Sequence, residues 1–161
     1  MKKSQEVRNK ILTCSRQLFQ KQGYNATTVR QIADAAGIQR GLLYYYFKHK
    51  EEIFIEGFTV TAHRFIETAK SEFSKYHDNP FRYLLIVYAY FHIVLNNTWG
   101  KIYIEVTDKV SLREIEIKIF DDLTNELLSD QANKEWNGHL MVLALLGMKH
   151  ELILEFCNNN K

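Results

Sequence analysis

The 161-residue sequence contains only one proline, seven glycines and two cysteines. Because proline and glycine interrupt helices, their scarcity favours long helices over a fold of many strands and turns. The cysteines, Cys14 and Cys157, are far apart and form no CxxC pair. A disulfide framework is therefore excluded, and a reducing, cytoplasmic location is expected. No apolar signal segment follows Met1, which agrees with that location.

Long hydrophobic runs are missing too. The longest apolar stretch is 81–95, and it includes Arg82 and His92. A membrane-spanning helix needs about 20 mostly apolar residues. The stretch therefore predicts a buried helix, and no contact with a membrane is expected.

Catalytic and metal-binding motifs are also missing. The six histidines (His49, His63, His77, His92, His139 and His150) form no HExxH motif, and neither a nucleophile elbow nor a phosphate loop occurs. The pairs His150-Glu151 and Asp121-Asp122 could be read as ligand or acid–base pairs. Adjacent residues on a helix point about 100° apart, so a solvated face explains them better. We expect no enzyme, no cofactor and no metal site.

Charge is present but unevenly distributed. The net charge is +2 overall. Residues 1–52 hold ten Lys/Arg and four Asp/Glu, a net +6, whereas residues 53–161 hold eleven and fifteen, a net −4. A basic N-terminal part on an acidic remainder suits a polyanionic partner for the N-terminal part only.

A first helix is predicted from Ser4, which can cap it, to Gln22. Its apolar stripe includes Val7, Ile11, Cys14 and Leu18. Cys14 on this stripe is expected to be a small core residue. Gly23 is expected to end the helix.

Two short helices should follow, joined by a tight turn. Thr28 is a suitable N-cap, and Gln31 completes a capping box. The first short helix has an apolar face of Ile32, Ala33 and Ala36 and is stopped by Gly37.

The second short helix is predicted over 40–47. Leu43 and Phe47, four residues apart, face inward together. Arg40, Gly41, Tyr44 and Tyr45 then lie on the outer face. Arginine, tyrosine and a bare glycine suit a DNA major groove, where Arg pairs with guanine or phosphate and Gly lets the backbone approach. The alternative is a half-buried amphipathic helix, since aromatic stripes usually belong to a core.

These residues resemble the TetR family of bacterial transcription regulators. The matching residues are Gly23-Tyr24, Thr27-Thr28-Val29, Ile32-Ala33, Ala36-Gly37-Ile38, Gly41, Leu43-Tyr44-Tyr45-Tyr46-Phe47 and Lys50-Glu51-Glu52-Ile53. The resemblance covers roughly the first third of the chain in register, without an insertion. It implies an all-α fold. A trihelical helix-turn-helix head (residues 1–50) is joined by a long helix to a helical effector-binding and dimerisation body (residues 51–161).

The resemblance also implies a set of DNA contacts. Thr28 and Arg30 would reach the DNA backbone and a base, although a solvated helix residue explains Arg30 equally well. The recognition segment would comprise Gln39, Arg40, Gly41, Leu42, Tyr44, Tyr45 and Tyr46, and Lys50 would clamp a phosphate. Leu42 departs from the polar residue common at its position, which suggests apolar contact with a thymine methyl.

Further helices are expected in the body. A long helix should run from Lys50 to about Tyr76, and Asn79-Pro80 predicts the start of another through residue 95. Residues 101–107 alternate like a strand, but a lone strand has no partner, so we favour a short helix. The capping box Ser111–Glu114 starts a helix with Ile115, Ile119, Leu123 and Leu127 on one side, and a final helix is expected over 133–157.

The body is expected to hold a ligand and to dimerise. Candidate wall residues are Tyr88, Phe91, His92, Trp99 and Tyr103, with ordinary core aromatics as the alternative reading. In the resembled family the last two helices of each subunit form a four-helix dimer interface. Only one of those two is recognisable here, which leaves the dimer geometry open.

We therefore expect a homodimeric repressor, released from palindromic double-stranded operator DNA by a small hydrophobic effector. The alternative is a helical protein-interaction module without effector control. DNA binding weakens steeply with ionic strength, whereas an apolar protein contact does not.

Overall fold

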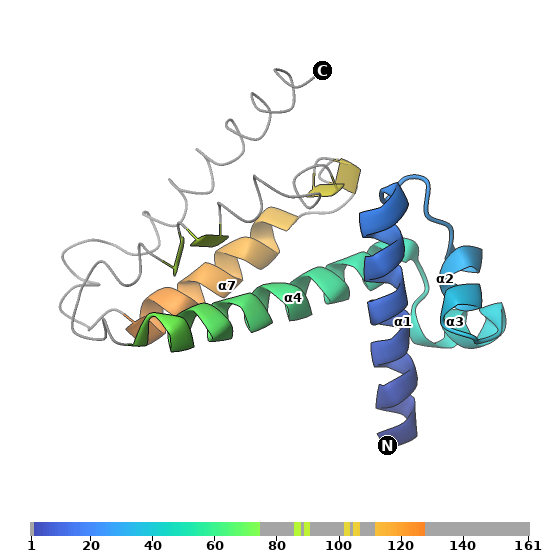
Figure 1. Ribbon diagram of the computed structural model, residues 1–161, viewed down its shortest axis with the longest axis horizontal. Coiled ribbons are helices and arrows are strands. Elements are labelled where there is room, and N and C mark those ends of the chain that lie inside the picture. Colours follow the sequence, from blue (N-terminus) through green and yellow to red (C-terminus); the bar gives the residue numbers. More distant parts are fainter. Residues whose placement is uncertain are drawn as a thin grey trace. The chain divides into compact units, whose positions relative to one another are not determined.

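The computed structural model describes residues 2–74, 86–87, 89–90, 102–103, 105–106 and 112–127 (Figure 1). Its helices are α1 (Lys2–Gln22), α2 (Val29–Ala35), α3 (Arg40–Tyr46), α4 (Lys50–Glu72) and α7 (Leu112–Leu127). The short described stretches between α4 and α7 are helical as well. The all-α fold class is confirmed: a three-helix head, the long α4 and a helical body.

The chain divides into two compact units. One contains Met1–Thr61 together with Lys101–Val110, and the other contains Ala62–Gly100 and Ser111–Lys161. A segment from the middle of the sequence therefore belongs to the same unit as the N-terminal helices.

Helix α1 ends where the sequence predicts but begins earlier. The predicted cap at Ser4 is wrong, because α1 starts at Lys2 and Ser4 lies in its first turn. At the other end Gly23 has φ 85°, and its backbone N–H donates to Phe19 O at 2.9 Å. This left-handed conformation favours glycine and ends the helix. Cys14, expected in the core, is only half-buried, with its thiol 3.4 Å from Ala35 O.

Helix α2 has the predicted capping box. The backbone N–H of Gln31 donates to Thr28 Oγ1 at 3.2 Å, and the N–H of Thr28 donates to Gln31 Oε1 at 2.9 Å. Both bonds satisfy donors that the first helical turn leaves without partners. At the far end Gly37 has φ 62°, as its role as a helix stop requires.

Helix α3 is one residue shorter than predicted. Phe47 has an extended backbone, with φ −140° and ψ 121°, and its N–H still donates to Leu43 O at 2.9 Å. The predicted inward pair is confirmed, because Leu43 and Phe47 are each only 1% exposed.

The core of the head is aromatic. Tyr24, in the turn after α1, is fully buried, and its ring lies 5.3 Å from Phe19 and 5.5 Å from Phe54 between ring centroids. The Phe54 ring also stacks on the ring of Phe58, one turn further along α4, with 6.1 Å between ring centroids. Offset and edge-on ring pairs of this kind add to the free energy of apolar burial. They attach the first turns of α4 to α1.

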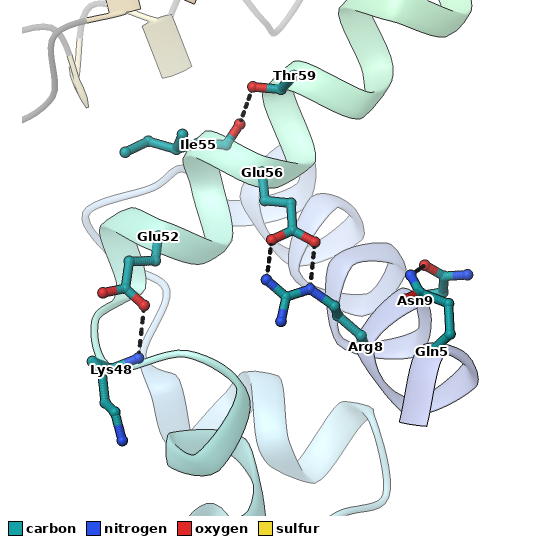
Figure 2. A network of polar contacts seen from close by, with 8 residues as sticks. All are labelled: Gln5, Arg8, Asn9, Lys48, Glu52, Ile55, Glu56 and Thr59. Carbon is teal, nitrogen blue, oxygen red and sulfur yellow. Dashed lines mark hydrogen bonds and ion pairs between the residues drawn. The ribbon is translucent and has the colours of Figure 1, made fainter. Parts of the chain in front are cut away.

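Arg8 makes a second connection between α1 and α4. Figure 2 shows its guanidinium paired with both carboxylate oxygens of Glu56, and the Nε–Oε1 distance is 2.6 Å. The guanidinium carbon also lies 4.5 Å from the centre of the Phe47 ring. The bond to Glu56 raises the pKa of Arg8 above its ordinary value, so the cation is present at all working pH values. One side chain thus contacts α4 and the residue that ends α3.

Predictions for the body are tested at only a few places. Residues 102–103 and 105–106 are helical, as favoured over a strand. In α7, Ile119 and Leu123 are buried and Ile115 is half-buried. The predicted helix over 79–95 falls mostly outside the described residues. The cap at Ser111, the side chain of Leu127 and the final helix over 133–157 lie outside them too.

Three buried residues of the second unit and the half-buried Phe65 form a cluster. Glu116 is 1% exposed and accepts a hydrogen bond from Tyr90 Oη at 2.7 Å. The Tyr90 ring lies 5.0 Å from Phe120 and 5.9 Å from Phe65, between centroids. These contacts connect α4, residues 89–90 and α7. None of the described helices combines the length and apolarity that crossing a membrane requires.

The Arg8 contacts predict a measurable stability effect. Arg8→Met retains the aliphatic stem and removes the cation. The Arg8 and Glu56 side chains are 34% and 30% exposed, so solvent screens the ion pair, and we expect the free energy of unfolding to fall by about 1 kcal/mol. Urea unfolding measures it. The control is Arg64→Met, an exposed arginine of α4; equal destabilisation by both variants would contradict the assignment.

Candidate nucleic-acid interface

The outer face of α3 is open to solvent. Leu42, Tyr44 and Tyr45 are 41%, 39% and 76% exposed. In the described part of the chain only one other large apolar side chain, Val60, is as exposed. Scattered exposed apolar residues need no explanation, but three on one short helix indicate a contact surface. The alternative of a half-buried helix does not apply to Tyr45, whereas Tyr44 is exposed over 39% of its surface.

The other residues predicted for this face also reach the surface. Arg40 and Gly41 are exposed, and a Cβ atom added at Gly41 would meet nothing within 4 Å. Gln39 is the N-cap of α3 but makes no capping hydrogen bond with its side chain. Tyr46 is half-buried, with its ring edge-on to Tyr45 at 5.3 Å between centroids.

Helix α2 presents two predicted contacts at its start. Thr28 is exposed, although its hydroxyl is used in the capping box. Arg30 is exposed too and lies 3.8 Å from Asp34, one turn further on. An ion pair with both side chains about three-quarters exposed contributes little to stability. Arg30 therefore has no strong structural function within α2.

Lys50 lies at the first residue of α4, with its ammonium group directed at the turn between α1 and α2. Nζ donates to Tyr24 O and to Thr27 O, both at 2.8 Å. It also lies 4.1 Å from the centre of the Tyr24 ring, which is cation–π geometry. Lys50 thus holds the turn from which α2 begins, a function that the sequence did not reveal. The predicted contact with phosphate remains a prediction.

Glu51 holds the same turn from the next position of α4. Tyr24 Oη donates to Glu51 Oε1 at 2.9 Å. Burial, followed by this hydrogen bond, raises the pKa of Tyr24 above its ordinary value. For Glu51 burial acts to raise the pKa. The hydrogen bonds from its own backbone amide and from Tyr24, together with the charges of Lys50 and His49, outweigh burial, so the pKa of Glu51 is lowered. The sequence suggested only a helix-dipole role for Glu51.

Of the five candidate wall residues of the ligand site, four lie outside the residues that the structure describes. These four are Tyr88, Phe91, His92 and Trp99. Tyr103 is described: it is 7% exposed and belongs to the unit that contains the N-terminal helices.

Two further residues near the turn were missed. In the sequence Tyr24 is only one of the residues that match the TetR family, yet in the structure it is the centre of the head core. Glu105 accepts a hydrogen bond from the backbone N–H of Asn25 at 2.9 Å, across 80 positions of sequence. A buried Tyr next to a helix-ending glycine is detectable from sequence as an isolated aromatic in a polar turn. No local signal identifies Glu105.

The geometry described so far is that of a helix-turn-helix DNA-binding protein. The second of two short helices presents a polar and aromatic face, and its other face is buried against the head.

Comparisons with known proteins agree with this class of protein. The family model for bacterial regulatory proteins of the tetR family matches residues 11–56. QacR, an HTH-type transcriptional regulator of Staphylococcus aureus, is 30% identical over 138 residues, 81% of this chain and 73% of QacR.

Solved structures show the same fold. The fatty acid degradation regulator FadR from Bacillus halodurans matches with a TM-score of 0.60 and 22% identity, covering 96% of this chain and 86% of that one. FadR from Bacillus subtilis, solved in complex with stearoyl-CoA, matches with a TM-score of 0.57 and 19% identity, covering 94% and 87%. Three further curated regulators match over 46–58 residues only, or 22–30% of their own length. The chain belongs to the TetR family of bacterial transcriptional regulators.

The Tyr24–Glu51 pair predicts a pH dependence of stability. The pKa of Glu51 is lowered in the folded state, so the unfolded state binds the proton more tightly. The contribution to stability is complete above the ordinary carboxyl pKa of about 4.3 and is lost as pH falls through the lowered folded value. Between about pH 5 and pH 3 the wild type should lose more stability than Glu51→Gln.

Urea unfolding across this pH range measures the difference. Glu72→Gln, which changes an exposed carboxylate of the same helix, should follow the wild type. Parallel curves for all three proteins would show that Glu51 is not coupled to folding.

Proposed function

We propose that α3 enters the major groove of operator DNA with its outer face toward the bases. The observation that carries the proposal is the exposure of Tyr45 (76%) and Leu42 (41%) beside an open Gly41. Arg40 would pair with guanine or phosphate, and Leu42 would contact a thymine methyl. Tyr44 would reach phosphate through its hydroxyl.

Flanking residues complete the proposed interface. Gln39, Tyr45 and Tyr46 extend the recognition segment, and Thr28 and Arg30 contact the adjacent backbone and bases from the start of α2. Lys50 is proposed to contribute in two ways, by attracting phosphate through its charge and by holding the turn before α2. The net charge of +6 over residues 1–52 supports a polyanionic partner for this part of the chain.

We propose further that the protein is a homodimeric repressor. One head reads a short half-site, so two heads related by a two-fold axis are needed for a palindromic operator with half-sites about 34–36 Å apart. Residues 1–50 would carry the DNA contacts, and residues 51–161 the effector site and the dimer interface. KstR2 of Mycolicibacterium smegmatis and KstR2 of Rhodococcus jostii, which match over 46 residues each, are named transcriptional repressors, which supports this direction of control.

A small hydrophobic effector is the proposed signal for release. The Bacillus subtilis FadR structure contains stearoyl-CoA, so a long-chain acyl-CoA is the first candidate. Tyr88, Phe91, His92, Trp99 and Tyr103 are the proposed wall residues. The effector must bind more tightly to a conformation that does not fit the operator, because equal affinity for both conformations would not shift the population.

The DNA proposal is tested by selecting bound duplexes from a random pool and titrating the selected operator with Gly41→Ala. A Cβ at Gly41 meets no protein atom within 4 Å. The substitution should therefore preserve the fold and raise stability by up to about 1 kcal/mol. In the groove the same methyl group would block close approach of the backbone, so we expect about tenfold weaker binding.

The matched control is Gly57→Ala in α4, where an added Cβ makes only an ordinary contact with Leu12 at 3.9 Å. This variant should bind like the wild type. Wild-type affinity should also fall steeply between low and moderate salt. No enriched palindrome, or binding that is insensitive to salt, would favour the protein-interaction module instead.

The effector proposal predicts coupled changes in stability and DNA affinity. Stearoyl-CoA should raise the melting temperature and weaken operator binding at least about fivefold. Coenzyme A without an acyl chain is the control and should do neither. If no ligand in a broad hydrophobic panel changes either quantity, a closed body without an effector is the better account.

A further inference from the structure

A carboxylate from the middle of the chain lies against the turn that leads into α2. Glu105 Oε2 accepts from the backbone N–H of Asn25 at 2.9 Å. A Cβ atom added at Gly23 would lie 2.9 Å from Glu105 Oε1 and 3.2 Å from Oε2. Because glycine has no side chain, Gly23 leaves room for the Glu105 carboxylate. The same property permits its φ of 85°. In Figure 1 the described pieces of 102–106 are drawn in yellow, near the C-terminal end of α1.

The contact does not follow from chain connectivity. Lys101–Val110 belongs to the same compact unit as Met1–Thr61, although residues on both sides of it belong to the other unit. Ile102 and Val106 are buried, at 1% and 0% exposure. Burial of these two side chains anchors the segment that carries Glu105, whose own side chain is half-buried.

Two opposite charges bind the backbone of the turn from outside it. Lys50 donates to its carbonyls at Tyr24 and Thr27, and Glu105 accepts its N–H at Asn25. Hydrogen bonds to charged groups are stronger than those between neutral groups. The residue after this turn is Thr28, the N-cap of α2. Both α4 and residues 101–110 therefore contact the turn that leads into α2.

We propose that Glu105 is a positioning residue for DNA binding, acting through the turn from Gly23 to Thr27. The proposal rests on the proposed function in that operator affinity is one of its two readouts. The proposal predicts a change in operator affinity opposite to the change that charge alone would cause. Removing a negative charge from a DNA-binding protein strengthens binding on electrostatic grounds alone, whereas loss of the bond to Asn25 allows the turn to move and weakens binding.

The decisive comparison is between Glu105→Ala and Glu105→Gln. Glutamine loses the charge but keeps an oxygen that accepts the Asn25 N–H. We expect Glu105→Ala to bind the selected operator about five- to tenfold more weakly, which corresponds to the loss of one hydrogen bond of average strength. Glu105→Gln should stay within about twofold of the wild type, since the acceptor is retained. The control Glu114→Ala removes an exposed charge from α7 and should bind at least as tightly as the wild type.

Amide hydrogen exchange at Asn25, measured by NMR without DNA, is the second readout. Exchange should be faster in Glu105→Ala and protected in Glu105→Gln. Operator binding by Glu105→Ala that equals or exceeds the wild type would overturn the proposal, as would unchanged protection of Asn25. If the wild type itself binds no duplex DNA, the proposed function fails, and the exchange data alone then decide whether Glu105 holds the turn.

Discussion

The hydrogen bonds from the Lys50 ammonium group to Tyr24 O and Thr27 O are the interaction on which the head depends. They join the first residue of α4 to the turn after α1, directly before the cap of α2. The same ammonium covers the ring of Tyr24, the central residue of the aromatic core. The turn also has hydrogen bonds of its own, because Thr27 N–H donates to Tyr24 O at 3.2 Å and Thr27 Oγ1 donates to Gly23 O at 2.7 Å. Lys50 adds charge-assisted hydrogen bonds to this turn and ties it to the start of α4.

The exposed outer face of α3 is a consequence of what α3 buries. Leu43 and Phe47 occupy the inner face and are almost fully buried, so the helical period directs Tyr44 and Tyr45 outward. Arg8 supports this arrangement from α1, since it contacts the ring of Phe47 and the carboxylate of Glu56 (Figure 2). A buried inner face and an open outer face are also what the proposed recognition by a short helix requires.

Much of the head could be predicted, because its elements are encoded over short distances. The capping box at Thr28 and the helix stops at Gly23 and Gly37 depend on residues within one turn of each other. The start of α1 was wrong, since Ser4 is a good cap that the chain does not use. Helix starts are the least certain part of such patterns, because a helix can extend past a favourable cap. Residues 101–107 alternate like a strand, but a lone strand would have no partner, which favours a helix. Residues 102–103 and 105–106 are helical.

The sequence by itself determined the helical fold, the capping of α2 and the direction that each side of α3 faces, and its resemblance to a known family indicated the class of protein. The local features follow from periodicity and capping, which act between near neighbours. Only the tertiary structure decided how Lys50 and Glu51 are used, and that Glu105 reaches Asn25 across 80 positions. A charged side chain can extend toward solvent or toward a distant backbone group. The choice depends on which groups packing brings within about 3 Å of it, and no local pattern contains that information.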